Sequence, residues 1–470
     1  MAPCKTVKIL EQCTVSPPPG SVAAAVPDIH LTFFDQMWLP LPPPQTLHFY
    51  DYPYPLSVFT QSLIPQIKLS LSSSLIYFYP LAGKLSWPQD SRPLIRYVDG
   101  DSVLVIIAES DADFNSLTSD HPRDATDSHP FVPDLQASGP ILPLLAIQIT
   151  VFPNFGLSVG MTNNHSLIDG RAIGHFMRTW ALMSKLGDAT KSLSTMSSPF
   201  LDRTVIKDPT GIEKVYLKEL ETFMGTEVVS GNRNLRVMNI PLPPDMVRAT
   251  MELNPTDLRR LKDWVLARHN KLEQPQPIRI STYVVTCAFA WVCLLKAEEA
   301  ATEHTPDNNT INNQTRFGVN VDCRSRLKTD PPIPGTYFGN CVKPFLVYTE
   351  RSNLLKEDGV VVATQLLAEG IRKLDEGLLK DLEKFLPEML NVESQRVFAA
   401  AGSPWFGLYE VDYGWGRPKK VEFVSNDRTG SMFMKASRKL DGGIELDVVL
   451  NKKEMDVFAS LFNGLRLIFD

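Results

Sequence analysis

The chain has 470 residues, which exceeds the length that one hydrophobic core normally supports, so we expect two domains. Apolar residues make up 43% of the chain and charged residues 21%, which is typical of a globular protein. There are 47 basic and 53 acidic residues, and the resulting net charge of −6 argues against nucleic acid as a partner.

Targeting and cysteine patterns give further expectations. The start of the chain lacks an apolar stretch of signal-peptide length, and no run of 18 apolar residues occurs anywhere. We therefore expect a cytoplasmic protein that does not enter a membrane. The six cysteines form no C-x-x-C pair, so neither a disulfide framework nor a zinc knuckle is indicated.

The first hundred residues alternate between strand-like and helix-like patterns. The patterns predict an edge strand at residues 7–10 and a helix at 57–78 that tolerates an internal proline. Two further strands are predicted at 94–97 and 103–107. Residues 145–183 then give the clearest signal. Apolar and polar residues alternate over 145–151, a turn follows, and the alternation resumes over 157–161, which predicts a half-buried hairpin.

A helix is predicted directly after this hairpin, because four apolar residues recur at helical spacing: Ile173, Phe176, Trp180 and Met183. His165 and Asp169 therefore lie where a core strand passes into a helix. Loops held by rigid elements often carry catalytic groups, so this segment is the candidate active site.

The rest of the chain predicts a second unit of strands and helices. Residues 185–244 show no sustained period and are interpreted as a crossover between an N-terminal domain, 1–184, and a C-terminal domain, 245–470. A helix beginning at Asn254-Pro255 is expected over 254–265, followed by a buried apolar segment at 281–295 and a polar surface loop at 297–315. A strand at 317–321 and a helix at 360–386, ended by Pro387, come next. Two strands at 421–423 and 444–450 and a final helix at 455–465 follow. This mixture predicts an α/β fold.

His165 is suited to act as a general base, because an imidazole accepts a proton near neutral pH. It needs an orienting partner, and Asp169 is the first candidate, although a spacing of four residues does not ensure that the two side chains meet. A buried histidine with a purely structural role is the alternative. His165 and Asp169 are also conceivable metal ligands, but no third ligand completes a recognisable zinc spacing.

A competing motif lies just upstream. Residues 156–160 read Gly-Leu-Ser-Val-Gly and fit the G-x-S-x-G pattern of serine esterases. In an esterase this serine occupies a sharp turn between a strand and a helix, whereas Ser158 lies inside the alternating run. The context therefore disfavours Ser158 as a nucleophile.

Several segments resemble motifs of the plant BAHD acyltransferases, which use acyl-CoA donors. Residues 165–170, His-Ser-Leu-Ile-Asp-Gly, resemble the HxxxDG motif, and residues 412–416, Asp-Tyr-Gly-Trp-Gly, resemble the DFGWG motif with tyrosine in place of phenylalanine. Residues 337–341, Tyr-Phe-Gly-Asn-Cys, are similar to a motif of the branch that acylates anthocyanins and other phenolic glycosides. Further likeness at 31–35, 79–83 and 321–324 extends the resemblance over nearly the whole chain.

The resemblance implies a two-domain fold of mixed sheets, similar to chloramphenicol acetyltransferase, with a channel between the domains. His165 corresponds to the general base of the family. Asp169 corresponds to an aspartate that turns away from the channel and pairs with an arginine, here Arg324. The segment around Asp412, Gly414, Trp415 and Gly416 corresponds to a structural motif remote from the chemistry, with Trp415 as a candidate wall of the acyl pocket.

The implied reaction transfers an acyl group from CoA to a sugar hydroxyl, with no metal and no bound cofactor. Thr32 and Asn340 are candidate donors to the oxyanion. Ser281 and Thr282 resemble positions near the CoA arm, and an N-cap is the alternative for this pair.

Donor choice stays open between malonyl-CoA, which we favour, and a hydroxycinnamoyl-CoA such as coumaroyl-CoA. Arg171 is a candidate partner of the malonyl carboxylate, and an exposed arginine without such a role is the alternative. We expect a monomer that binds an acyl-CoA and a glycoside. A non-catalytic relative that binds a ligand through the same groove remains a different class of function.

Overall fold

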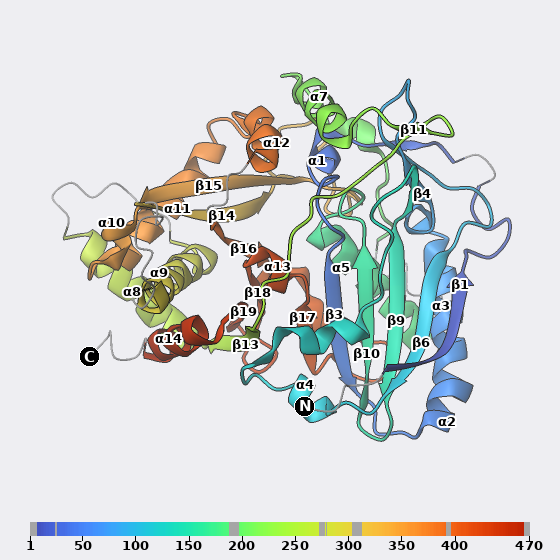
Figure 1. The fold of residues 1–470 in the computed structure, drawn as a ribbon, viewed down its shortest axis with the longest axis horizontal. Coiled ribbons are helices and arrows are strands. Elements are labelled where there is room, and N and C mark those ends of the chain that lie inside the picture. The colour runs from blue at the N-terminus through green and yellow to red at the C-terminus, as the bar shows by residue number, and fades with distance from the viewer. Residues whose placement is uncertain are drawn as a thin grey trace.

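The computed structural model describes residues 7–23, 26–187, 197–271, 278, 280–302, 313–391 and 396–464. Two lobes lie side by side in the ribbon view (Figure 1). One lobe is built mainly from the first half of the chain and the other from the second half, and each has its own mixed sheet. The expected two-domain fold of mixed sheets is therefore present.

The first lobe contains a six-stranded sheet in which β6 and β9 are parallel and the other neighbours are antiparallel. Its order is β1 (Val7–Val15), β6 (Val103–Ser110), β9 (Leu145–Phe152), β10 (Gly156–Asn163), β3 (Gln45–Asp51) and β17 (Lys420–Phe423). Two helices that pack on each other, α3 (Ile64–Leu75) and α5 (Gly170–Leu186), share the apolar core of this sheet. The α3 helix follows a π-helical turn at 59–63, and Pro65 lies at its start.

The predicted hairpin is formed by β9 and β10, but both strands are buried on both faces. The second face is covered by a 3-10 helix at 125–131 and the residues that directly follow it. Gln148 donates from Nε2 to the carbonyl oxygen of Pro130 over 2.8 Å, and Thr162 donates to the carbonyl oxygen of Pro133. The expectation of a half-buried hairpin was wrong for this reason: the polar positions of the alternation face protein instead of water.

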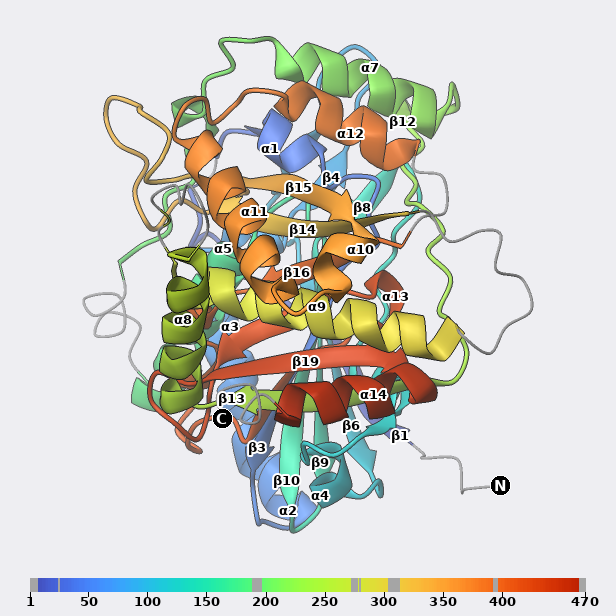
Figure 2. The same ribbon diagram turned by 90° about the vertical axis from the view of Figure 1, so that its left-hand side faces the viewer.

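The second lobe contains a seven-stranded sheet whose order is β15 (Val342–Glu350), β14 (Gln314–Asp322), β16 (Phe398–Gly402), β18 (Met432–Ala436), β19 (Ile444–Asn451), β13 (Met246–Leu253) and β7 (Arg123–Asp124). Figure 2 shows one face of this sheet covered by helices, namely α8 (Pro255–His269), α9 (Thr282–Thr302), α10 (Arg351–Leu355), α11 (Gly359–Leu374) and α14 (Lys452–Asn463). The buried apolar segment predicted at 281–295 forms most of α9 and lies in the core of this lobe.

Each lobe contributes one strand to the sheet of the other. β17 comes late in the chain but pairs with β3, and β7 comes early but pairs with β13. The two exchanged strands are joined by an ion pair of 2.6 Å between Arg123 and Glu422. The predicted domain ranges 1–184, 185–244 and 245–470 stay a prediction. The two sheets do not keep to these ranges, because β7 pairs in the sheet of the second lobe and β17 in the sheet of the first.

The remaining strands form a four-stranded sheet and a small hairpin: β2 (Ile29–His30), β5 (Leu94–Arg96), β4 (Lys84–Ser86) and β8 (Ile141–Pro143), then β11 (Val228–Val229) and β12 (Asn232–Arg233). The remaining helices are α1 (Phe33–Gln36), α2 (Leu56–Val58), α4 (Phe114–Leu117), α7 (Ile212–Met224), α12 (Leu382–Leu390) and α13 (Asn426–Thr429). In the described part of the chain, no helix is long and apolar enough to span a bilayer.

Three predicted elements differ from the structure. The supposedly irregular stretch 185–244 contains α7, whose buried residues recur every fourth position at Ile212, Tyr216, Leu220 and Met224 and whose neighbour is α12. The helix predicted over 360–386 is two helices, and Pro387 lies inside the second. The segment predicted as a polar loop at 297–315 is helical up to Thr302, and from Gln314 it belongs to β14. Residues 303–312 of this segment lie outside the described residues, as does Leu465 of the final predicted helix.

Candidate active site

The loop at residues 164–169 joins the end of β10 to the start of α5, as the sequence predicts. Its first turn is closed by Asn164, whose Oδ1 accepts hydrogen bonds from the backbone N–H and the hydroxyl of Ser166. Its last residue, Asp169, is the N-cap of α5 and accepts from the backbone N–H groups of Arg171 and Ala172 at 3.2 and 3.0 Å. The loop is thus fixed at both ends.

His165 is partly buried in this loop, and its two ring nitrogens differ. Nδ1 is buried and forms no hydrogen bond with another described residue, whereas Nε2 is not buried and has no hydrogen-bond partner in the described part of the chain. Burial lowers the pKa of His165, and the carbonyl of the same residue, the Asp169 carboxylate and the Asn340 side chain offset part of this shift. A neutral imidazole with an accessible Nε2 is what a general base requires.

Asp169 does not orient the imidazole. One carboxylate oxygen lies 2.8 Å from Nη2 of Arg324, and the other partners of the carboxylate are the first turn of α5 and the backbone N–H of Cys341. Both side chains of the ion pair are only 3% exposed. The expected pair of Asp169 and Arg324 is present, and the simpler idea of a His165–Asp169 dyad was wrong.

Arg324 ties the loop to the YFGNC segment. Its guanidinium donates to the carbonyl oxygens of Tyr337 and Gly339 at 3.1 and 3.0 Å, and Nη1 reaches Asp322 at 3.2 Å. Burial opposes the charge of Arg324, but the carboxylates of Asp169 and Asp322 outweigh this and raise its pKa. The side chain therefore stays charged and holds three segments together.

A second buried ion pair lies on the other side of the loop, and the sequence did not reveal it. Nε of Arg203 is 3.2 Å from Oδ2 of Asp35, and both side chains are buried. Arg203 also donates to the carbonyl oxygens of Leu167 and Phe338. Arg203 lies in the stretch 185–244, where no periodic pattern marks it as a buried residue. The one signal for this ion pair in the sequence was Asp35, a single acidic residue in an aromatic stretch.

Thr32 and Asn340 were candidate oxyanion donors, but their polar hydrogens are used within the protein. The Thr32 hydroxyl donates to Asp35 at 2.9 Å. The amide nitrogen of Asn340 donates to Asp35 at 3.0 Å and to the backbone carbonyl oxygen of His165 at 2.8 Å. The geometry therefore assigns both residues to support of the loop.

Two glycines of the motifs are required by close packing. A Cβ added at Gly170 would lie 2.6 Å from a ring carbon of Phe406, and one at Gly339 would overlap with the guanidinium of Arg203. Contacts this short are not tolerated without movement of the neighbour. The glycines thus allow the ring and the guanidinium to approach the backbone of the site.

Arg171 and the residue pair at the start of α9 already have partners. Arg171 forms an ion pair of 2.9 Å with Asp322 and is about half exposed. Ser281 accepts from the backbone N–H of Val284, so it caps α9, and Thr282 accepts from Lys262. The cap interpretation is therefore supported for Ser281.

The DYGWG segment is a turn docked on the far end of α5. Asp412 accepts from the backbone N–H groups of Gly414 and Gly416 and pairs with Lys185 at 2.6 Å. Both glycines have left-handed φ angles, 106° and 103°, which favour glycine. Lys185 is fifteen residues beyond Gly170, and at 1.5 Å per residue the turn lies roughly 20 Å from the 164–169 loop.

Trp415 stacks on Tyr413 at 4.9 Å and packs edge-on against Tyr50 and Tyr52. Tyr413 in turn packs on Trp180 of α5. The aromatic cluster supports the structural interpretation of the motif. It does not support the idea that Trp415 forms a wall of the acyl pocket.

The alternative sites find no support. Ser158 lies in the middle of β10, paired with Phe49 and Thr150, and its buried hydroxyl has no hydrogen-bond partner among the residues that the structure describes. It therefore has no base and no turn, both of which an esterase nucleophile needs. Among the described residues, no group of three or more His, Cys, Asp or Glu side chains is placed to hold a metal ion.

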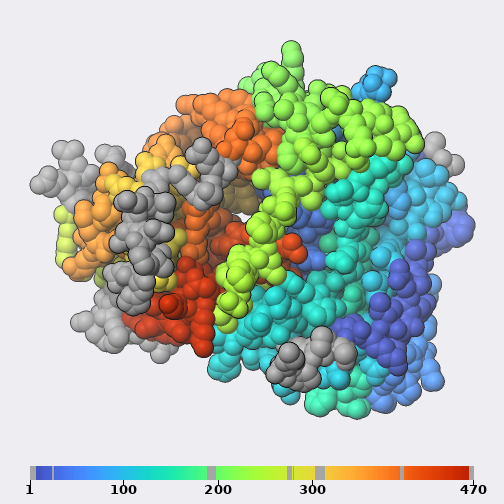
Figure 3. All heavy atoms as spheres, viewed as in Figure 1, coloured from blue at the N-terminus to red at the C-terminus, as the bar shows by residue number. Residues whose placement is uncertain are grey.

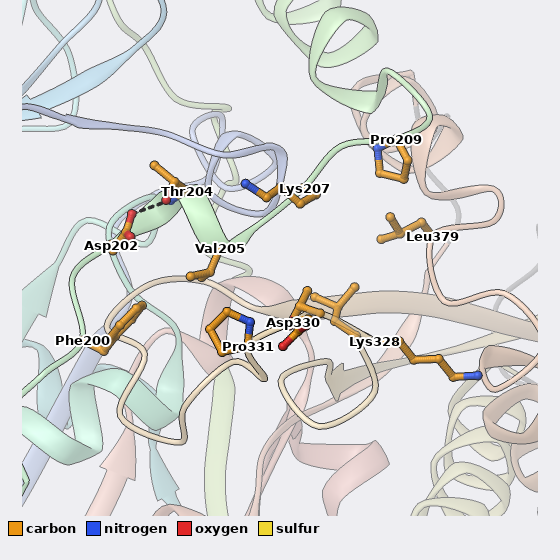
Figure 4. Close-up of a pocket in the computed structure, with 12 residues that line it drawn as sticks. Phe200, Asp202, Thr204, Val205, Lys207, Pro209, Lys328, Asp330, Pro331 and Leu379 are labelled. Carbon is orange, nitrogen blue, oxygen red and sulfur yellow. Dashed lines mark hydrogen bonds between the residues drawn. The ribbon is translucent and has the colours of Figure 1, made fainter.

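The space between the lobes is open at the surface. Figure 3 shows a hollow between the two lobes, next to the segment that leads into β13. A pocket of about 600 Å³ is lined by residues 327–331 and by seven further side chains: Phe200, Asp202, Thr204, Val205, Lys207, Pro209 and Leu379 (Figure 4). Neither His165 nor its supporting residues line this pocket, so it is separate from the candidate site.

Comparison with known proteins agrees with these features. A model of the Transferase family matches residues 6–465. The chain is 39% identical over 468 residues to phenolic glucoside malonyltransferase 1 of Nicotiana tabacum, with 97% of this chain and 98% of the relative covered. It is 36% identical over 472 residues to coumaroyl-CoA:anthocyanidin 3-O-glucoside-6''-O-coumaroyltransferase 1 of Arabidopsis thaliana, with 97% and 96% covered.

Solved structures share the fold at much lower identity. The crystal structure of vinorine synthase aligns with a TM-score of 0.71 and 17% identity, covering 97% of this chain and 98% of that one. That of TRI101 from F. sporotrichioides gives 0.62 and 16%, covering 91% and 96%. The near-complete family match and the relatives above 30% identity show that the chain belongs to the Transferase family of BAHD acyl-CoA-dependent acyltransferases.

Proposed function

We propose that the protein transfers an acyl group, most readily malonyl, from acyl-CoA to a sugar hydroxyl of a phenolic or flavonoid glucoside, with His165 as general base. The observation that carries this is the imidazole itself, which has a lowered pKa and an unoccupied Nε2 in a loop fixed by two buried ion pairs. The names of the relatives support the substrate classes. We further propose that the enzyme acts in the cytoplasm as a monomer.

The reaction uses Nε2 of His165. The acceptor hydroxyl gives its proton to Nε2 while its oxygen attacks the thioester carbonyl carbon, which forms a tetrahedral oxyanion. The intermediate collapses, the C–S bond breaks, and the CoA thiolate leaves and takes the proton back from the imidazolium. The ester is formed and neutral His165 is restored, so no covalent acyl-enzyme is needed.

General base catalysis of this type contributes roughly 10²- to 10⁴-fold. Alignment of acceptor and donor in one ternary complex contributes much of the remainder. Because Thr32 and Asn340 use their hydrogens on Asp35 and His165, the oxyanion is stabilised by other groups.

The donor preference rests on the relatives more than on Arg171. Malonyltransferases and coumaroyltransferases are both among them, and the relative with 39% identity is a malonyltransferase. Arg171 would have to share its guanidinium between Asp322 and the malonyl carboxylate. A hydroxycinnamoyl donor such as coumaroyl-CoA on the same acceptor class is the alternative.

The test is release of free CoA, measured with a thiol reagent, from malonyl-CoA or coumaroyl-CoA in the presence of a flavonoid glucoside. We expect acceptor-dependent release with malonyl-CoA that His165→Ala abolishes. His121→Ala is the matched control, because His121 is an exposed histidine. Release that persists in the His165 variant, or no release with either donor from the folded protein, would reject the proposal.

A further inference from the structure

Trp38 lies flat against the imidazole of His165. The ring centroids are 4.2 Å apart and the ring planes differ by 15°. Trp38 is only 7% exposed, and its indole nitrogen is buried without a hydrogen-bond partner among the described residues. The indole therefore acts toward His165 as a flat apolar surface.

This stack matters because none of the described residues forms a well-directed hydrogen bond with the buried Nδ1 of the imidazole, although the Asn340 side chain lies near enough to raise the pKa of His165. A catalytic histidine is usually oriented by a group bound to the nitrogen that faces away from the substrate. In this site Nδ1 is buried, and no described residue forms such a bond with it. The torsion that rotates an imidazole about its Cβ–Cγ bond has a broad, two-fold preference, so an unsupported ring does not hold one plane.

The indole is itself held firmly. Trp38 lies one residue beyond Met37, the C-cap of the short helix α1, which begins with a capping box in which Thr32 and Asp35 bond each other. Its backbone N–H donates to the carbonyl oxygen of Asp35 at 3.2 Å, and its own carbonyl oxygen accepts from Leu41 at 3.1 Å. Residues 31–40 are all buried. The segment is thus a fixed wall of the site.

Asp35 links this wall to the backbone of His165. Its Oδ1 accepts from Nδ2 of Asn340, and the same amide donates to the carbonyl oxygen of His165 at 2.8 Å. Arg203 neutralises Asp35 from the other side. His165 is therefore held at its carbonyl through Asn340 and at its ring face through Trp38, and both of these residues are bonded to Asp35, Asn340 to its carboxylate and Trp38 to its backbone carbonyl oxygen.

We propose that Trp38 is a positioning residue that fixes the plane of the His165 imidazole and keeps Nε2 directed toward the acceptor. This role rests on the proposed function and differs from that of the Asp169–Arg324 pair, which holds the loop. The indole also covers one face of the imidazole, in agreement with the lowered pKa of His165.

The test compares Trp38→Phe, which keeps a flat ring, with Trp38→Leu, which keeps apolar bulk but no plane. We expect Trp38→Leu to lower kcat roughly 10- to 100-fold, the range for a catalytic group displaced by about 1 Å, with little change in KM for the acyl-CoA. Trp38→Phe should retain most of the activity. Trp264→Leu is the matched control, because Trp264 lies on α8 in the other lobe.

The pH profile provides a readout that a purely structural role would not change. Loss of the indole exposes the imidazole to water, so its pKa should rise toward about 6.5 and the acid limb of kcat/KM should move to higher pH in Trp38→Leu. Trp38→Phe should keep the wild-type limb. If Trp38→Leu does not fold, Trp38→Met, which is closer in volume, takes its place.

The outcomes separate this inference from the proposed function. A folded Trp38→Leu protein with wild-type kcat and an unchanged acid limb would overturn the positioning role. Equal losses in Trp38→Phe and Trp38→Leu would also overturn it, because they would assign the effect to the indole N–H. Activity in His165→Ala would instead overturn the proposed function itself.

Discussion

Asp169 and Arg324 are 155 residues apart in the chain, yet their nearest side-chain oxygen and nitrogen atoms lie 2.8 Å apart. The same carboxylate caps α5 and accepts from the backbone N–H of Cys341. One side chain therefore performs two tasks: it begins the helix behind the 164–169 loop, and it fastens that loop to the second lobe.

Substitution of Asp169 separates these two tasks. Asp169→Asn keeps an N-cap oxygen but loses the charge, whereas Asp169→Ala loses both. Removal of one member of a buried ion pair costs about 3–5 kcal/mol, and loss of an N-cap costs about 0.5–2 kcal/mol. In urea unfolding we expect both variants to be strongly destabilised, with Asp169→Ala the less stable, and kcat should fall in both.

The matched control for this prediction is Asp322→Asn. Asp322 contacts the same arginine but is 39% exposed, and exposed pairs contribute about 0–1 kcal/mol. An Asp169→Asn protein with the stability and kcat of Asp322→Asn would show that the buried pair does not hold the loop.

The strand, loop and helix that carry His165 were predictable because their signals are local. Alternation over 145–161 and helical spacing over 173–183 depend only on neighbouring residues. These elements lie at β9, β10 and α5 as expected. The pairing of Asp169 with Arg324 joins distant segments, and only the family resemblance indicated it.

The second support of the site was not predictable, because it is assembled from three distant segments. Trp38, Arg203 and Asn340 are far apart in the chain, and all three contact the 164–169 loop in the folded protein. Arg203 precedes α7 in a stretch rich in polar residues and prolines, where no period marks it as buried. A lone acidic residue such as Asp35 in an aromatic stretch indicates a buried charge, but a single sequence does not show which distant residue pairs with it.

The pH dependence of kcat/KM follows from the environment of His165. Burial lowers the pKa of His165, and the base is active only when it is neutral. The acid limb of kcat/KM, which reports on the free enzyme, should therefore lie below the ordinary histidine pKa of about 6.5. His121→Ala should leave it unchanged, and a limb at or above that value would contradict the proposed state of the imidazole.

Gly339→Ala should disturb the Asp35–Arg203 pair. The added Cβ would overlap with the guanidinium of Arg203, which is buried and bonded to three segments. Overpacking of this kind costs about 1–3 kcal/mol, and kcat should fall with it. Gly335→Ala is the control in the same loop, because its Cβ meets only the half-exposed side chain of Arg171. Equal melting temperatures and kcat values in the two variants would refute the prediction.

Glu422→Gln tests the strand exchange between the lobes. Glu422 lies on β17 and is 1% exposed, and it accepts from Arg123 of β7 at 2.6 Å and from Ser128 at 2.7 Å. At pH 7 we expect the variant to lose about 3–5 kcal/mol, because it leaves Arg123 buried without its partner. Glu369→Gln is the control, since Glu369 forms an exposed pair with Arg372.

The loss in Glu422→Gln should depend on pH in a defined window. Burial alone would raise the pKa of Glu422, but Arg123, Arg248 and Lys420 outweigh it and lower the pKa to about 2. A carboxyl with a depressed pKa stabilises the fold fully above its unfolded value of about 4.3, and the contribution is lost as pH falls through the folded value. Unfolding free energies of the wild type and of Glu422→Gln should therefore differ most at pH 5–7 and converge as the pH approaches 2. A difference that is constant over this range would mean that the charge of Glu422 does not join the lobes.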